Sequence, residues 1–183
     1  MKKYLLICLA LAFTMCCKKT DTNNLDAELA KLPPITQTGA NTFGCLVNGK
    51  AVLPSGCIGC PPPLEGFYDN NPNGQFGLVC RYNNNHNDVG FGLDSILTYK
   101  NFIIDDSTNK NVRVALFNDK LSDSCRWVGL VGALSNFASI KGNIKLTKVD
   151  VPNGIFSGTF NFTIKTKSCS NYEVTNGRFD YKF

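Results

Sequence analysis

Cysteine is the residue type with the widest choice of chemistry in this chain of 183 residues. Nine cysteines are many for this length, and a thiol can form a disulfide, bind zinc or take part in redox exchange. Six of them lie in the body of the chain, and this even number predicts a disulfide framework. We favour a Cys125–Cys169 pair, because both flank the expected C-terminal strands. The six candidates are Cys45, Cys57, Cys60, Cys80, Cys125 and Cys169.

The segment Cys57-Ile58-Gly59-Cys60 allows three interpretations. A redox CxxC pair opens a helix whose dipole lowers the thiol pKa, but here three prolines, Pro61–Pro63, follow and lack the N–H groups that such a helix needs. A zinc site needs further ligands, and the chain has no second CxxC and a single histidine, His86. We therefore interpret the two cysteines as half-cystines that close a proline-rich loop, and we expect no cofactor.

The segment Asp69-Asn70-Asn71-Pro72-Asn73-Gly74 fits the start of a calcium-binding loop, in which oxygen ligands alternate along the chain. Asp69, Asn71 and Asn73 would be the ligands of a weak calcium site. A complete loop carries a bidentate Glu at the position occupied here by Cys80, and the segment has one formal negative charge. We favour a turn between two strands.

His86 and the carboxylates are the candidates for acid–base catalysis. The chain contains no G-x-S-x-G motif, so we interpret His86 as a solvated loop residue. Asp105 and Asp106 are adjacent, and adjacent strand residues point to opposite faces, which does not suit a glycosidase carboxylate pair. We therefore expect no enzyme. The alternative is a hydrolase or small-ligand carrier whose site is assembled from loops and gathers His86 with Asp88 or Asp69.

Trp127 is the only tryptophan, and Arg126 precedes it. An exposed indole ring would offer a surface on which a sugar can stack, whereas a single tryptophan in a sandwich is more often part of the core. We favour the core position.

The first residues have the pattern of a targeting signal. Two lysines precede the apolar run Tyr4–Met15, which is too short for a membrane-spanning helix but suits a secretory signal. The run ends in two cysteines followed by polar residues, which resembles the lipobox of bacterial lipoproteins. We assign residues 1–16 as the signal peptide and Cys17 as the lipidated residue, with Cys16 as the alternative. An ordinary cleaved signal peptide is the other interpretation.

This leader predicts a protein held by a lipid anchor in the cell envelope of a Gram-negative bacterium, in the outer membrane, on its periplasmic face or at the cell surface. Such an oxidising location favours disulfides. Removal of the leader takes Lys2 and Lys3 and lowers the formal net charge from +5 to +3. The remaining charge is not gathered in a Lys/Arg block, so we expect no nucleic-acid partner.

Residues 17–41 are predicted to be the lipid anchor and a tether. The segment Leu25–Leu32 can form two helical turns with its leucines on one face, and Pro33-Pro34 ends any helix. If this linker is flexible, it spans about 25–30 Å root-mean-square. The helical turns would otherwise dock on the domain, and the sequence does not decide between the two.

Residues 42–183 have the pattern of a β-rich domain. Asn is the commonest residue, with 21 copies, and 16 Gly and 13 Phe accompany it, which favours short strands joined by turns. Asn48-Gly49 predicts a type I′ turn, and Asp150–Asn153 predicts another hairpin turn. Asn176-Gly177 predicts either a further tight turn or a bulge, and we favour the bulge. The expected strands after the first hairpin are Gln75–Tyr82, Asp88–Ile96, Asn111–Phe117, Asn143–Val149, Gly154–Thr166 and the tail through Phe179, Tyr181 and Phe183.

These segments predict an all-β fold of about 8–9 strands, either an antiparallel two-sheet sandwich or a partly closed barrel. The clearest strand is Gly154–Thr166, because Phe156, Phe160 and Phe162 fall on one face and polar residues on the other. No strand–helix–strand alternation is present, so a parallel α/β scaffold is not expected.

Three motifs resemble those of a family of β-rich lipoproteins from Bacteroidota-type bacteria. They are the opening run Leu32–Lys50 (LPPITQTGANTFGCLVNGK) and the closing runs Ile155–Phe160 and Thr175–Asp180. The resemblance implies a β-rich domain on a lipid anchor, and it implies no catalytic residues. The expected function is that of a lipid-anchored binding or structural module, whose partners are the membrane, through its anchor, and an envelope protein or glycan.

Overall fold

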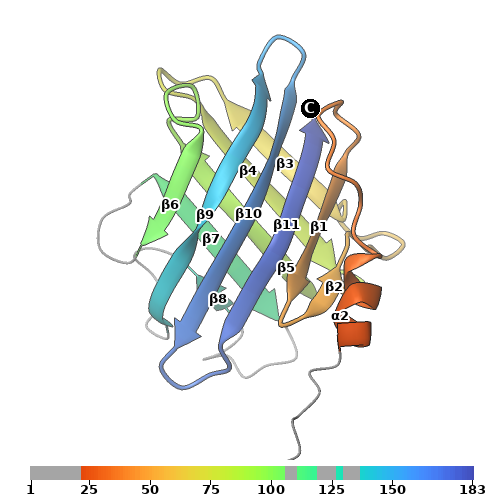
Figure 1. The fold of residues 1–183 in the computed structure, drawn as a ribbon. Helices are drawn as coiled ribbons and strands as arrows, with labels where there is room; N and C mark the ends of the chain where they lie inside the picture. Colours follow the sequence, from red (N-terminus) through yellow and green to blue (C-terminus); the bar gives the residue numbers. More distant parts are fainter. Residues whose placement is uncertain (1–21, 106–110, 119–126, 130–136) are drawn as a thin grey trace, which may run out of the picture.

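The computed structural model describes residues 22–105, 111–118, 127–129 and 137–183. Within these ranges the chain forms two antiparallel sheets that pack face to face, as Figure 1 shows. The expected two-sheet sandwich is therefore confirmed, and the sheets do not close into a barrel. The sheets contain eleven strands where about 8–9 were expected. The additional strands are short, and a few residues carry too little alternation to be recognised.

The six-stranded sheet has the order β2-β1-β11-β10-β9-β6. The long strands β9, β10 and β11 form its centre, and β10 pairs with both of the others. The strands of this sheet are β1 (Thr42–Val47), β2 (Lys50–Val52), β6 (Asn101–Asp105), β9 (Phe137–Asp150), β10 (Ile155–Thr166) and β11 (Tyr172–Lys182).

The second sheet has five strands in the order β3-β4-β5-β7-β8. Strand β3 was not predicted, because it follows three prolines and contains a glycine, yet all six of its residues pair with β4. The strands of this sheet are β3 (Leu64–Asp69), β4 (Gln75–Tyr82), β5 (Asn87–Asp94), β7 (Val112–Asn118) and β8 (Trp127–Gly129).

Two predicted backbone features are confirmed. Asn48 and Gly49 have φ angles of 50° and 76°, so both lie in the left-handed region that a type I′ turn requires. In the β10–β11 ladder Phe160 pairs with Gly177 and Phe162 with Val174, so β11 has one extra residue between the two pairs. That extra residue is the bulge expected at Asn176-Gly177.

Aromatic rings fill the space between the two sheets. Phe76 of the five-stranded sheet stacks on Phe156 of the six-stranded sheet, with ring centroids 5.0 Å apart. Phe91 and Phe179 meet across the same interface at 5.2 Å. Each buried Phe stabilises the fold by about 1.5–3 kcal/mol through the apolar area that it removes from water. Side-chain packing between the inner faces therefore joins the two sheets.

The helix α2 (Thr22–Leu29) lies beside β2 at the edge of the six-stranded sheet (Figure 1). Glu28 is buried there and accepts hydrogen bonds at 2.8 Å from the ammonium group of Lys31 and from the backbone N–H of Ala51. These hydrogen bonds lower the pKa of Glu28. The sequence left open whether these turns hang free or dock, and the structure shows that they dock.

The segments predicted to be the leader and the anchor lie outside the described residues. This holds for the signal segment 1–16 and for both lipidation candidates, Cys17 and Cys16. Among the residues that the structure describes, no helix combines the length and the apolar character needed to cross a bilayer.

Candidate functional site

Residues 33–41, which we call the strap, cross the outer face of the six-stranded sheet between α2 and β1. The carbonyl of Pro33 accepts a hydrogen bond from the guanidinium group of Arg178 on β11, at 3.2 Å. The carbonyl of Gln37 accepts one from the ammonium group of Lys148 on β9, at 3.1 Å. The strap thus reaches across three strands, and this part of the expected tether belongs to the folded domain.

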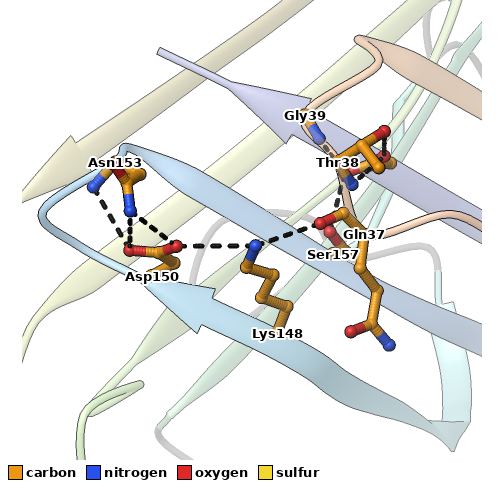
Figure 2. A network of polar contacts seen from close by, with 8 residues as sticks. Gln37, Thr38, Gly39, Lys148, Asp150, Asn153 and Ser157 are labelled. Atoms are coloured by element: carbon orange, nitrogen blue, oxygen red, sulfur yellow. Dashed lines mark hydrogen bonds and ion pairs between the residues drawn. The ribbon is translucent and has the colours of Figure 1, made fainter.

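Asp180 of β11 fastens the strap to the sheet. Its side chain is almost completely buried, with 1% of the residue exposed, and its carboxylate accepts six hydrogen bonds. Figure 2 shows the strap residues Thr38 and Gly39 above Ser157 of β10. The donors are Thr36 Oγ1 (2.7 Å), Thr38 N (2.9 Å) and Oγ1 (3.3 Å), Gly39 N (2.8 Å), Ala40 N (3.1 Å) and Ser157 Oγ (2.7 Å).

The ionisation of Asp180 follows from these contacts. Burial alone would raise its pKa, but the hydrogen bonds from Thr36, Ser157 and the backbone N–H groups of the strap outweigh burial. The pKa of Asp180 therefore lies well below its ordinary value of 3.8. Because two carboxylate oxygens have about four lone-pair positions, six donors use the full capacity of the group. Asp180 is therefore a structural fastening and is not available to a ligand.

A second cluster of polar side chains lies next to the strap, at the β9–β10 turn, as Figure 2 shows. The Lys148 ammonium group, which donates to the strap, lies 3.4 Å from the carboxylate of Asp150. The side-chain amide of Asn153, in the β9–β10 turn, donates to both oxygens of Asp150 at 3.0 Å. These hydrogen bonds lower the pKa of Asp150. The polar groups under the strap are thus paired with one another.

Beyond the strap, the outer face of the sheet is open and contains two hollows along β10. We call this region the open half. The first hollow, of about 270 Å³, is lined by Ile35, Thr159, Phe160, Asn161, Asn176, Gly177 and Arg178. The second, of about 390 Å³, is lined by Ser139, Lys141, Thr163 and Lys165.

The first hollow results from the strap and the bulge together. Ile35, 59% exposed, forms its wall on the strap side. Gly177 packs directly on Phe160, and a Cβ at this position would lie 2.5 Å from the ring, so any side chain here would clash with it. Arg178 donates to the carbonyls of Pro33 and Asn176. Its guanidinium group is thus held in the wall of the hollow by neutral acceptors.

The open half carries positive charge without paired carboxylates. Among the described residues, none of its four cations lies within 4.0 Å of a carboxylate oxygen. Two acids share this face: the sheet register places Asp105 opposite Lys141 and Glu173 opposite Thr163. The region therefore has amide, hydroxyl and cationic donors that face solvent. The four cations are Lys141, Lys145, Lys165 and Arg178.

The predicted loop disulfide Cys57–Cys60 is present, with Cα atoms 5.3 Å apart. The six-cysteine framework is wrong for Cys45 and Cys80, which are free thiols and completely buried in the core. Burial raises the pKa of Cys45 to about 12 and that of Cys80 further. The reason is packing: each thiol is an inward residue of its strand and acts as a small apolar side chain.

Cys169 is disulfide-bonded. Cys125, the partner that we favoured for it, lies outside the described residues. The framework therefore contains at least one loop staple and a bonded cysteine near the β10–β11 connection, where the hydroxyl of Thr166 also donates to the carbonyl of Cys169.

The calcium candidates form the β3–β4 turn, the interpretation favoured above. Asp69 ends β3, and the carbonyl groups of Asn71 and Asn73 accept backbone hydrogen bonds within and beside this turn. In the described ranges, His, Cys, Asp and Glu side chains form no group of three that would hold a metal ion. In the structure these residues connect β3 with β4.

His86 lies in the β4–β5 turn, where its N–H donates to the carbonyl of Asn83 at 3.3 Å. Asp88 pairs with Arg81 in the β4–β5 ladder, and burial raises its pKa while Arg81 lowers it. Asp69 lies at the other end of β4, so the structure does not gather it with His86. Neither hollow of the open half is lined by His86.

Two further candidates are only partly described. Asp105 ends β6 and pairs with Lys141, whereas Asp106 lies outside the described residues. Trp127 begins β8 and pairs with Phe117 in the β7–β8 ladder, and its side chain is outside what the structure describes. Asp105 shares the outer face with the open half but lines neither hollow.

Sequence reasoning missed the residues that build the site. Asp180 stands at a polar position of the C-terminal strand and is indistinguishable by pattern from a solvated acid. Arg178 and Asn161 look equally ordinary. The one signal was the predicted bulge at Asn176-Gly177, since bulges concentrate where a sheet is reshaped for function.

Comparison with known proteins yields no relative: the chain matches no protein family model, no curated protein and no solved structure.

Proposed function

We propose that the protein is a lipid-anchored binding module of the bacterial cell envelope, and that it holds an acidic glycan on the open half. The observation that carries this proposal is the pair of hollows along β10, whose walls present amide, hydroxyl and cationic groups. Sugar hydroxyls accept from and donate to such amides and hydroxyls, and sugar carboxylates pair with ammonium and guanidinium groups.

The shape of the open half supports an extended ligand. Thr159, Asn161, Thr163 and Lys165 follow one another at every second residue of β10 and line the two hollows in turn. Alternate residues of a strand lie about 6.6–6.8 Å apart on one face. The polar groups thus form a row along which a chain of polar units can make repeated contacts.

The interior of the domain argues against a carrier that encloses its ligand. Rings such as Phe76 and Phe156 occupy the space between the sheets, whereas ligand-carrying barrels keep that space open. A hydrolase or carrier site around His86 was the alternative, and His86 lines neither of the two hollows. A binding module with an external site is therefore the better supported function, with no enzymatic activity proposed.

The proposed location in the cell envelope rests on the predicted leader. An apolar run that ends at Cys16-Cys17, and the motif resemblance to lipid-anchored proteins, support a lipid on Cys17. A Cys16→Ser/Cys17→Ser double variant should leave the membrane fraction and appear in the soluble fraction. If the double variant still fractionates with membranes, the lipoprotein assignment is wrong.

A glycan array tests the ligand class. The mature chain should bind acidic glycans more tightly than neutral ones, and binding should weaken as salt increases. The variant Lys141→Gln/Lys165→Gln should lose at least about tenfold in affinity, because each lysine supplies a charge-assisted contact. The matched control Lys50→Gln/Lys167→Gln removes the same charge elsewhere and should bind as the wild type does. Equal losses in both variants would contradict a site on the open half.

A further inference from the structure

A row of polar side chains crosses the open half from strand to strand. Thr159 of β10 pairs with Lys145 of β9 on one side and with Arg178 of β11 on the other. Asn101 of β6 pairs with Lys145 and extends the row. Side chains of directly paired residues project from the same face of a sheet. These four residues, which we call the cationic row, therefore lie next to one another on the outer face, with two positive charges and no acid among them.

The row that contains Lys141 and Thr163 has a different charge pattern. Thr163 pairs with Lys141 on β9 and with Glu173 on β11, and Lys141 pairs with Asp105 on β6. An acid therefore stands at each end of this row, on either side of its lysine. An anionic group of a ligand is repelled less at the cationic row than at the row of Lys141.

The guanidinium group of Arg178 is fixed by the backbone and keeps donors for a ligand. Its Nε donates to the carbonyl of Asn176 at 3.3 Å, and its Nη1 donates to the carbonyl of Pro33 at 3.2 Å. Both acceptors are neutral, and three of the five guanidinium N–H groups remain. Because neighbouring strands lie about 4.7–4.9 Å apart, the backbones of Lys145 and Arg178 lie about 9–10 Å apart across Thr159. A carboxylate above Thr159 is within reach of both cationic side chains.

A pair of amides lies beside the cationic row, one alternate residue further along β9 and β10. The side-chain amide of Asn161 donates to the amide oxygen of Asn143 at 2.8 Å. This bond leaves the amide N–H groups of Asn143 and the amide oxygen of Asn161 for a ligand, and sugar hydroxyls both donate and accept. Ile103, 68% exposed, pairs with Asn143, and Ile35, 59% exposed, lines the same hollow as Asn161. Exposed apolar side chains thus stand near the amides, where the C–H face of a sugar ring can pack.

The topology of the sheet argues against an acidic peptide as the source of the carboxylate. Extended peptides bind sheets by pairing with the free edge of an outer strand. Strands β9, β10 and β11 are each paired on both sides, so the open half offers side chains and no strand edge. Amide and hydroxyl side chains match a ligand that carries many hydroxyl groups.

We propose that the cationic row binds the carboxylate of a uronic acid unit, and that the ligand is an oligosaccharide with more than one such unit. This inference rests on the proposed function and names the ligand class of the same site. Thr163, in the second hollow with Lys141 and Lys165, lies four residues beyond Thr159, which is about 13 Å along β10. A single sugar ring does not span this distance, so the second hollow takes a carboxylate from another unit of the glycan.

Titration of the mature chain with a galacturonate hexamer and with its methyl ester tests the row, because the ester has the same sugars without the charge. The wild type should bind the hexamer at least about tenfold more tightly than the ester. It should also bind the hexamer at least about tenfold more tightly than galacturonate monomer, which fills one position only.

Two variants test the cations of the row. Lys145→Gln should bind the hexamer about tenfold more weakly and the ester as the wild type does. Arg178→Lys keeps the charge but loses the planar donor group, so it should also lose about tenfold of its preference for the hexamer over the ester. The matched control Lys167→Gln removes one charge outside both hollows and should bind both ligands as the wild type does.

The outcomes separate this inference from the proposed function. Equal losses in Lys145→Gln and Lys167→Gln, or a loss for the ester that matches the loss for the hexamer, would overturn the assignment of the row. A glutamate peptide of the same charge that binds as tightly as the hexamer would identify the ligand as an acidic peptide. If the wild type binds acidic glycans while both row variants keep their preference, this inference alone fails. If it binds no acidic glycan, the proposed function fails too.

Lys145→Gln keeps the test valid if Arg178→Lys disturbs the strap. Lys145 is exposed and forms no ion pair with the described residues, whereas Arg178 is bonded to the strap through Pro33.

Discussion

The outer face of the six-stranded sheet has two halves, one beneath the strap and one open, and strands β9, β10 and β11 contribute to both. Beneath the strap, the polar side chains of Asp180, Ser157 and Lys148 all have partners. In the open half, Lys141 and Lys165 line a hollow and have no carboxylate within ion-pair distance among the described residues. The same strands thus carry paired polar groups that hold the fold and solvent-facing polar groups that can bind.

The difference lies in what covers the face. The strap supplies backbone N–H groups from Thr38, Gly39 and Ala40, which would otherwise need water, and Asp180 accepts all three. A buried polar network stabilises a protein only when every member is satisfied. Lys141 and Lys165 of the open half are exposed, so replacing them is expected to cost the fold little. Stability and binding are therefore expected to respond separately to substitutions in the two halves.

The largest expected effect is that of Asp180→Ala. Six hydrogen-bond donors would lose their acceptor in a buried place, so the free energy of unfolding should fall by about 3–5 kcal/mol. Urea denaturation followed by circular dichroism measures this. Glu173→Ala, an acid on the open half of the same strand, should change it by less than about 0.5 kcal/mol. Equal effects of the two substitutions would contradict the claim that the strap-covered half stabilises the fold more than the open half does.

The second-largest effect is expected on acidification, which should lower the free energy of unfolding by weakening the attachment of the strap to Asp180. The pKa of Asp180 is lower in the folded chain than its ordinary 3.8, so the unfolded chain binds the proton more readily. The stabilisation is therefore fully present above about pH 5 and is lost as the pH falls below 3.8, with about 2 kcal/mol lost by pH 2. Urea midpoints measured between pH 7 and pH 2 should fall in this window for the wild type and much less for Asp180→Asn. A parallel fall in both would assign the acid sensitivity to other carboxylates.

The sequence predicted the strands and turns of the six-stranded sheet better than it predicted the strap that covers part of this sheet. Alternation reports which side of a strand faces the core, so β10, the Asn48-Gly49 turn and the bulge beside Gly177 could be recognised. The strap could not, because Thr36 and Asp180 are separated by 144 residues and their bond leaves no local pattern.

The cysteines show the same limit of sequence reasoning. Spacing correctly predicted the Cys57–Cys60 staple, since two cysteines three residues apart can meet within a loop. The even number of cysteines wrongly predicted bonds for Cys45 and Cys80. A buried thiol and a half-cystine occupy similar inward positions of a strand, and pattern alone does not separate them.

A smaller effect is expected for Ser157→Ala. Its hydroxyl donates to Asp180 at 2.7 Å in a buried place, while the strap donors keep the carboxylate bonded, so the loss should be about 1–2 kcal/mol. Thr163→Ala is the matched control, because Thr163 lies on the same strand and lines the open hollow. Thermal and urea denaturation should show a loss for Ser157→Ala and a change within about 0.5 kcal/mol for Thr163→Ala. The opposite ranking would mean that the open half, too, is structural.

The smallest effect on stability is expected where the effect on binding is largest. Lys141→Gln/Lys165→Gln should change the free energy of unfolding by less than about 0.5 kcal/mol, because both side chains are exposed and form no ion pair within the described part of the chain. The same variant should lose affinity for acidic glycans at least about tenfold. Urea denaturation and glycan titration of one protein preparation measure both quantities. A loss of stability that matches the loss of affinity would place these lysines with Asp180 as part of the fold, whereas an unchanged affinity would show that the ligand lies elsewhere.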